Sequence, residues 1–242
     1  MSKNEYNYNY CLYYDYCDGE LNYNFFKDEE GNYYLKENTK YHDPDVDNEL
    51  LYNFWKSYLD NNNALPNKKG IGIKSTEIEK TRKQLVLIVQ LTNNKKIEMT
   101  TDYIGPRKSD YERYGKIELG NFLKETRIIA GSMIWPCRCF YEGNVRISTI
   151  NQYKGFNKRE RMDLVLQDIK KCYNGEMARD DTIGRIFEHY SFWFKDCFEN
   201  YGEFVKYFKL NFFEEITEKN LKCYIEEIGS IIRERKKVLT VN

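Results

Sequence analysis

The sequence predicts an α+β fold, in which a small antiparallel sheet from the amino-terminal 150 residues packs on about four carboxy-terminal helices. Three observations predict it. Apolar residues alternate with polar ones in segments before residue 155, they recur at helical spacing after Phe156, and no Gly-, Ser- or Pro-rich linker separates the two parts. We expect a single domain over 1–242, mainly β with one helix over 20–155 and helical over 156–236.

The first residues of the chain are rich in tyrosine and follow a period of two. Tyrosine or leucine fills the even positions from Tyr6 to Tyr16, and Asn or Asp fills several of the odd ones. This alternation is typical of a half-buried strand, which the turn at 17–20 would join to a second strand at 21–26. A flexible polar and aromatic extension over 1–17 is the alternative interpretation.

One main helix and a second hairpin are expected next. Residues 48–59 carry an apolar stripe at helical spacing, with Asp47 as candidate N-cap. Residues 83–91 and 97–104 are rich in β-branched side chains and flank an Asn-rich turn. The other expected elements are a loop at 61–70, a short helix near 116–126, a strand at 126–135 stopped by Pro136, a loop at 137–144 and a partner strand at 145–153.

Four helices are expected in the carboxy-terminal part, because apolar residues recur there with a period near 3.6. The four stripes consist of Leu164, Val165, Ile169, Cys172 and Tyr173; of Ile183, Ile186, Phe187, Tyr190, Phe194, Cys197 and Phe198; of Phe204, Phe208 and Phe212; and of Leu221, Tyr224, Ile225, Ile228 and Ile232.

The charge of the chain is balanced overall but unevenly distributed. Lys+Arg and Asp+Glu each number 38. Residues 1–60 carry a net charge of −8 (5 basic against 13 acidic), residues 61–161 of +10 (20 against 10) and residues 162–242 of −2 (13 against 15). The middle of the chain is therefore its basic part, and an acidic start folded over it is one explanation.

The cysteine count and the hydropathy predict the compartment. Seven cysteines are odd in number and too sparse for a disulfide framework, which favours a reducing cytoplasm. The sequence has no secretory leader pattern and no apolar stretch long enough to cross a bilayer. We expect a cytoplasmic protein with no membrane partner and no cofactor.

The segment 148–164 holds the candidate ligand site. Asn151 and Gln152 end an expected strand, Gly155 permits a tight turn, and Asn157 can cap a helix whose Glu160 completes a capping box. Four cations crowd this helix start, where they oppose the helix dipole. Free amides, amide side chains and cations can together hold a phosphate or carboxylate. The candidate ligand-binding residues are Asn151, Gln152, Lys154, Lys158, Arg159 and Arg161. A simple helix cap with solvated cations is the alternative.

Other chemistry has less support in the sequence. Asp43, Asp45 and Asp47 alternate, but the calcium-loop glycine and the final carboxylate are missing. The two cysteines in 137–139 lack zinc-finger spacing, so no metal is expected. His189 lies between apolar positions, which predicts a half-buried residue. We find no nucleophile motif and no catalytic residues, so an enzyme acting through Asp43, Asp45 or Asp163 is only a third hypothesis.

Several short motifs occur in an order that resembles a bacterial protein family of similar length and unknown function. The matching pieces are Asp43-Pro44-Asp45, Phe54-Trp55-Lys56, Leu65-Pro66-Asn67, Ala130-Gly131-Ser132-Met133-Ile134-Trp135-Pro136, Thr149-Ile150-Asn151-Gln152 with Gly155, and Arg161-Met162-Asp163-Leu164. The resemblance covers the chain from about residue 20 to 215. The resemblance implies a bacterial or phage origin and a shared fold, and it implies no reaction.

The leading functional hypothesis is a protein that binds a nucleotide or nucleic acid through a phosphate group at residues 151–161. The alternative is a protein-interaction module, such as an inhibitor or effector in phage–host conflict, that uses the exposed tyrosines and acidic residues of the amino-terminal region. The sequence leaves both hypotheses open.

Overall fold

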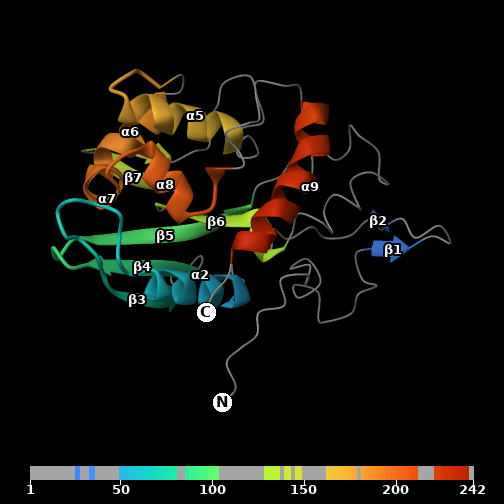
Figure 1. The fold of residues 1–242 in the computed structure, drawn as a ribbon, viewed down its shortest axis with the longest axis horizontal. Helices are drawn as coiled ribbons and strands as arrows, with labels where there is room; N and C mark the ends of the chain where they lie inside the picture. The colour runs from blue at the N-terminus through green and yellow to red at the C-terminus, as the bar shows by residue number, and fades with distance from the viewer. Residues whose placement is uncertain are drawn as a thin grey trace, which may run out of the picture.

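The computed structural model confirms the α+β class (Figure 1). It describes residues 25–27, 33–35, 49–80, 85–103, 128–136, 139–142, 145–148, 162–178, 181–211 and 221–239. A four-stranded antiparallel sheet comes from the first part of the chain, and the helices α5 to α9 follow it. In Figure 1, α2 crosses in front of β3 and β4, while α6, α7 and α8 lie above β5.

The sheet has the strand order β3-β4-β5-β6, and every neighbouring pair in it is antiparallel. The predicted hairpin is confirmed as β4 (Leu85–Leu91) and β5 (Lys96–Tyr103). Asn94 has a φ of 65° in the turn, a conformation that asparagine tolerates better than most residues. Strand β3 (Ile73–Lys80) was not predicted, because most of its side chains are charged or exposed and only Ile73 and Thr76 are buried.

Helix α2 (Glu49–Asn61) confirms the predicted helix. Its stripe members Leu51, Phe54 and Trp55 are buried. Tyr52 fastens the helix to the sheet, because its hydroxyl donates to the Leu85 carbonyl at 2.7 Å and accepts a hydrogen bond from the Thr101 amide at 3.4 Å. The candidate N-cap Asp47 lies outside the described residues.

The region after β5 differs from the prediction in its pairing. The 3₁₀ helix η1 (Ile129–Gly131) precedes β6 (Ser132–Pro136), which pairs with β5. The predicted loop at 137–144 contains a strand, β7 (Cys139–Glu142), and this strand is the partner of β8 (Val145–Ser148). Local hairpin pairing therefore replaces the expected pairing of 126–135 with 145–153.

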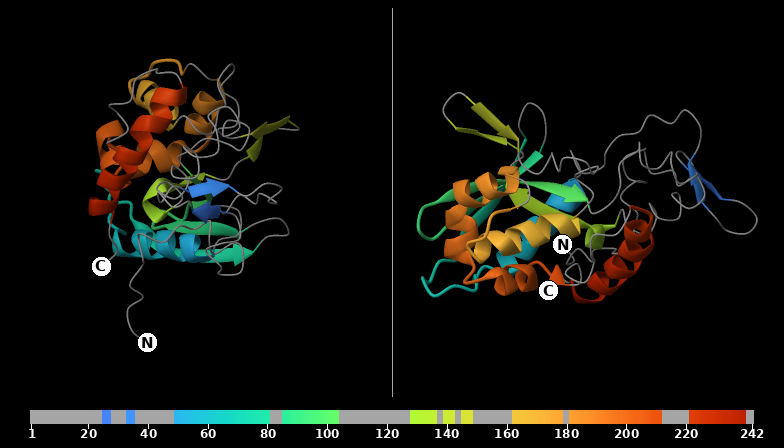
Figure 2. Two further views of the ribbon diagram at one scale, coloured as in Figure 1. Left: turned by 90° about the vertical axis from the view of Figure 1, so that its right-hand side faces the viewer. Right: turned by 90° about the horizontal axis from the view of Figure 1, so that it is seen from above.

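Two small hairpins lie at opposite ends of the molecule in the right panel of Figure 2. One is β7–β8, and the other is β1 (Phe25–Lys27) paired with β2 (Tyr33–Leu35). The hairpin predicted from 4–16 and 21–26 lies almost entirely outside the described residues, and so does the helix predicted near 116–126.

Five helices replace the four expected in the carboxy-terminal part, within the residues that the structure describes. They are α5 (Met162–Tyr173), α6 (Asp181–His189), α7 (Ser191–Cys197), α8 (Tyr201–Tyr207) and α9 (Leu221–Val238). The stripe from Ile183 to Phe198 predicted one helix, but the backbone breaks at Tyr190, which has φ −100° and ψ 32°. Both halves still bury their apolar residues, so periodicity alone did not reveal the break.

A continuous hydrophobic core joins α2, the four-stranded sheet and the helices α5 to α9. Aromatic rings dominate the contact between α2 and α8, where Trp55 packs against Phe208 and Tyr58 against Tyr207. Large rings bury much apolar area each, so the aromatic residues of this chain contribute strongly to the core.

The fully buried Arg235 joins the start of β6 to the end of α8. Its guanidinium donates to the carbonyls of Ala130 and Ser132, both at 2.6 Å, and of Phe208 at 3.0 Å, while Nε donates to the Lys209 carbonyl at 3.1 Å. Burial lowers the pKa of Arg235 to about 9, so the group is still charged at neutral pH. The four carbonyls thus supply the hydrogen bonds that a buried cation needs.

Candidate functional site

The predicted ligand site lies between two described elements but outside the described residues. Residues 151–161, which include Asn151, Gln152, Lys154, Lys158, Arg159 and Arg161, follow β8 and precede α5. Asp43 and Asp45 also lie outside the described residues, and Asp163 belongs to α5. The structure therefore describes the elements that flank the site.

Helix α5 is held firmly at the border of this segment. Its inner face buries Leu164, Val165 and Ile169 in the common core. Its last turn carries Lys170 and Lys171, where cations interact favourably with the helix dipole. The position of α5 is thus fixed by packing along the face that points into the protein.

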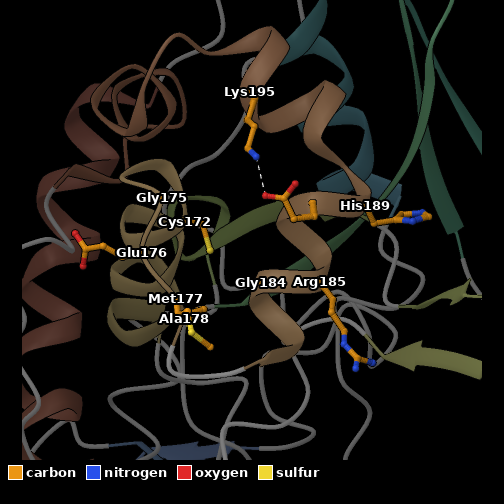
Figure 3. Close-up of a pocket in the computed structure, with 10 residues that line it drawn as sticks. Cys172, Gly175, Glu176, Met177, Ala178, Gly184, Arg185, His189 and Lys195 are labelled. Carbon is orange, nitrogen blue, oxygen red and sulfur yellow. Dashed lines mark hydrogen bonds and ion pairs between the residues drawn. The ribbon is translucent and has the colours of Figure 1, made fainter.

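The described part of the chain has a pocket at the other end of α5, between α5 and α6 (Figure 3). Its volume is about 510 Å³, which lies within the range of small-ligand sites. We call it the α5–α6 pocket, and it is lined by Cys172, Gly175, Glu176, Met177, Ala178, Gly184, Arg185, Glu188, His189 and Lys195.

The end of α5 forms one wall of the α5–α6 pocket. Gly175 has a φ of 76°, which glycine adopts at little cost. Its amide donates to the Cys172 carbonyl at 3.2 Å, and the Glu176 amide donates to the Lys171 carbonyl at 2.8 Å. These two bonds form a Schellman motif, which turns the chain sharply out of the helix. Met177 follows this turn with 85% of its surface exposed.

Helix α6 forms the opposite wall and has a glycine in its interior. A Cβ atom added at Gly184 would meet the Ala178 Cβ atom at 3.9 Å, which is an ordinary contact. Packing therefore does not require glycine here, although glycine in a helix interior costs about 1 kcal/mol relative to alanine. The missing side chain leaves space in the pocket.

An ion pair lies at one end of the α5–α6 pocket. The break at Tyr190 brings α7 back toward α6, so that Lys195 Nζ lies 2.6 Å from Glu188 Oε1 and 5.1 Å from the centre of the Phe187 ring. The two charged side chains remain 44% and 68% exposed for Lys195 and Glu188. Both groups are thus accessible to a ligand from solvent.

The thiol of Cys172 belongs to the same end of the pocket. In Figure 3 it points from α5 toward α6, while Arg185 and His189 point away from α5. Burial, together with the smaller effect of the Asp168 and Glu188 carboxylates, raises the pKa of Cys172 to about 11 against the opposing effect of Lys195. The thiol is protonated at neutral pH, so it is a weak nucleophile and a soft, nearly apolar wall.

Sequence reasoning did not find the α5–α6 pocket. The pocket depends on a tertiary contact between two helices, and its members are scattered over a stretch in which no motif stands out. Gly184 is the one sequence signal, since it places the smallest residue inside a predicted helix, next to the apolar stripe. His189, predicted to be half-buried, is exposed and packs edge-on against the Tyr190 ring at 4.6 Å.

Among the described residues, no group of three or more His, Cys, Asp or Glu side chains gathers as a metal site would require. Within the same ranges, no helix has both the length and the apolar character needed to cross a membrane.

Three residues of the sequence motifs have structural roles. Trp55 Nε1 donates to Ser132 Oγ at 3.0 Å, and this hydroxyl donates to the Ile129 carbonyl at 2.7 Å. The Asn67 side chain donates to the carbonyls of Leu65 and Ile71 and accepts hydrogen bonds from the amides of Lys69 and Ile71. These motifs therefore serve the fold.

Comparison with known proteins identifies a family. The sequence profile of a family described as "Family of unknown function (DUF6994)" covers residues 20–227. The chain belongs to this family. The region that matches DUF6994 thus includes α2, the whole four-stranded sheet and the helices α5 to α8, while Arg235 lies beyond the matched residues. No curated protein and no solved structure matches the chain significantly.

Proposed function

We propose that the protein binds a phosphate-bearing ligand, a nucleotide or nucleic acid, at residues 151–161. One observation carries the proposal: this segment, immediately before α5, contains four cations and a single acidic residue. Lys154, Lys158, Arg159 and Arg161 would supply the charge, and Asn151 and Gln152 would orient the phosphate group.

The cations at the two ends of α5 have opposite effects on the stability of the helix, and this difference supports the proposal. Lysines in the last turn of a helix stabilise it through the dipole, whereas cations before the first turn oppose it. The conflict costs a few tenths of a kcal/mol per cation in the free protein. A bound phosphate would remove it, because a phosphate group interacts favourably with both the cations and the first-turn amides.

The test compares charge removal at the two ends of α5 in the full-length protein. The double variant Lys158→Gln with Arg159→Gln removes two charges from the proposed site, and Lys170→Gln with Lys171→Gln removes two from the opposite end. Fluorescence anisotropy with single-stranded RNA and DNA oligonucleotides, and calorimetry with ATP, would measure affinity. We expect the first variant to lose about tenfold or more in affinity and the second to remain near wild type.

Salt dependence provides a second measurement. If about four phosphate contacts form with a single strand, doubling the salt concentration lowers the affinity about sevenfold. Absence of binding to all three probes, an affinity that salt does not change, or equal losses in the two variants would contradict the proposal.

The other sequence-based functions remain predictions. The interaction module depends on the acidic, tyrosine-rich start of the chain, and the enzyme depends on Asp43, Asp45 and Asp163. No observation in the described residues favours either over phosphate binding. The cytoplasmic location likewise remains a prediction from the cysteine content.

A further inference from the structure

We propose that the α5–α6 pocket binds a small zwitterion, namely an α-amino acid with an apolar side chain. The inference does not depend on phosphate binding, because the pocket lies at the opposite end of α5 from residues 151–161. It is drawn from the ion pair, the apolar walls and the helix-interior glycine of the pocket.

The ion pair offers one partner for each charge of a zwitterion. Lys195 donates to Glu188 Oε1, and no hydrogen bond from the described part of the chain reaches Glu188 Oε2. An ammonium carries three donors, so Lys195 also has donors to spare. An α-amino acid carries its ammonium and carboxylate on one carbon atom. Its ammonium can therefore donate to Glu188 Oε2 while its carboxylate accepts from Lys195, which closes a ring of alternating charges.

The rest of the pocket suits an apolar side chain. Met177 and Ala178 line it from the turn after α5, and the protonated thiol of Cys172 borders it near the ion pair. The methionine side chain is exposed and adaptable, and a ligand would cover it. In Figure 3, Met177 and Ala178 lie away from the ion pair, and the other polar side chains of the lining, Glu176, Arg185 and His189, point outward from the space between α5 and α6. The space between the two helices thus has an apolar part next to its charged part, as an amino acid with an aliphatic or aromatic side chain requires.

Gly184 indicates that the space itself is used. Glycine is the weakest helix former after proline, and a methyl group would fit at this position without a clash. Helix α6 thus has glycine at a position where alanine would fit and would favour the helix more, and the glycine keeps the pocket open. We infer that the ligand side chain occupies the space next to Gly184.

Calorimetry on the full-length protein tests the proposal with matched probes. Leucine, methionine and phenylalanine are the zwitterions, 4-methylpentanoate lacks the ammonium of leucine, and 3-methylbutylamine lacks its carboxylate. We expect saturable binding of at least one amino acid with one site per chain. For leucine or its analogues, loss of either charge should weaken binding about tenfold or more.

Variants identify the site. Glu188→Gln should weaken amino-acid binding about tenfold and leave the binding of 4-methylpentanoate, which has no ammonium, unchanged. Lys195→Met should also weaken amino-acid binding about tenfold, and it should leave the binding of 3-methylbutylamine, which has no carboxylate, unchanged. Gly184→Leu should abolish binding by filling the pocket. Glu234→Gln is the control, because Glu234 forms an equally short, exposed ion pair with Lys237 on α9.

The proposal fails if none of the three amino acids binds at millimolar concentration, or if the singly charged analogues bind as well as the amino acid that binds most tightly. It also fails if Glu234→Gln weakens binding as much as Glu188→Gln, or if Gly184→Leu leaves binding unchanged. Circular dichroism would confirm that each variant is folded, and exposed ion pairs contribute little to stability, so Glu188→Gln and Lys195→Met should pass this check.

Discussion

Two helix interfaces of this protein differ in how completely they are filled. Where α2 and α9 meet the sheet, the side chains of Tyr52, Trp55 and Arg235 all form hydrogen bonds in buried surroundings. Where α5 meets α6, the structure has a pocket, a helix-interior glycine and an exposed ion pair. The first interface is built for stability, and the second gives up some stability for open space.

The difference indicates which changes should unfold the protein and which should affect only a ligand. Burial of polar groups is costly unless each finds a partner, so the loss of one partner in the filled interface leaves the others unsatisfied. The open interface already faces water, and its charges keep much of their hydration there. Substitutions in it should therefore have small effects on the free energy of unfolding.

The largest effect is expected for Arg235→Met. The substitution keeps an unbranched apolar stem but leaves four carbonyl groups without their guanidinium donors. The free energy of unfolding should fall by about 3–5 kcal/mol, measured by urea denaturation. Arg233→Met on the exposed face of the same helix is the control, with a change of about 1 kcal/mol or less. Similar losses in the two variants would show that the hydrogen bonds of Arg235 do not stabilise the fold.

A smaller loss is expected for Asn67→Ala. This side chain donates two hydrogen bonds of 3.0 Å or less and accepts two of 3.0 Å within the loop that follows α2. At about 0.5–1.5 kcal/mol per bond, with some compensation by water, the free energy of unfolding should fall by about 2–3 kcal/mol. Asn93→Ala in the β4–β5 turn removes a single exposed bond and should cost less than about 1 kcal/mol. A wild-type denaturation midpoint for Asn67→Ala would contradict the assignment.

The pH dependence of Cys172 measures how far the wall of the pocket excludes water. Its pKa is about 11 in the folded protein against an ordinary value of 9.0. Alkylation by iodoacetamide, followed by mass spectrometry, should be slow at pH 8 and accelerate about tenfold per pH unit until pH 11. Because the pKa is raised by folding, the Cys172 thiol ionises at a lower pH in the unfolded chain than in the folded protein. The contribution of the protonated thiol to the free energy of unfolding is therefore lost as the pH rises from 9 through 11. An alkylation rate that levels off near pH 9 would show a solvated thiol.

The smallest effect, and one of opposite sign, is expected for Gly184→Ala. Alanine is the better helix former and meets no close contact at this position, so the free energy of unfolding should rise by up to about 1 kcal/mol. For a chain of this length that corresponds to about 2–4 °C in the melting temperature, measured by differential scanning calorimetry. A destabilised variant would mean that α6 requires glycine for packing after all.

Local patterns predicted the elements with a dense apolar signal. The stripe of Leu51, Phe54 and Trp55 predicted α2, and the dense β-branched run of β4 predicted the hairpin with β5. Strand β3 was missed, because an edge strand keeps many charged side chains in solvent and its alternation is diluted. The break at Tyr190 was also missed, since both flanking helices bury apolar residues.

The sites depend on information that a linear pattern does not contain. Arg235 resembles an ordinary cation in the last turn of a helix, and only the tertiary position of the four carbonyls makes it a buried donor. Glu188 and Lys195 are seven residues apart and meet because the chain bends between α6 and α7. The predicted residues Asn151, Gln152 and Arg161 lie outside the described residues and remain a prediction.

The hydrogen bonds from Arg235 to the start of β6 have a consequence for folding during translation. Ser132 and Ala130 precede Arg235 by 103 and 105 residues, so their carbonyls leave the ribosome long before the guanidinium that binds them exists. Until then water must hydrate that strand edge, and a nascent chain paused within the helical region exposes it to neighbouring chains. Co-translational folding of the sheet is therefore expected to finish late, with chaperone binding concentrated in that interval.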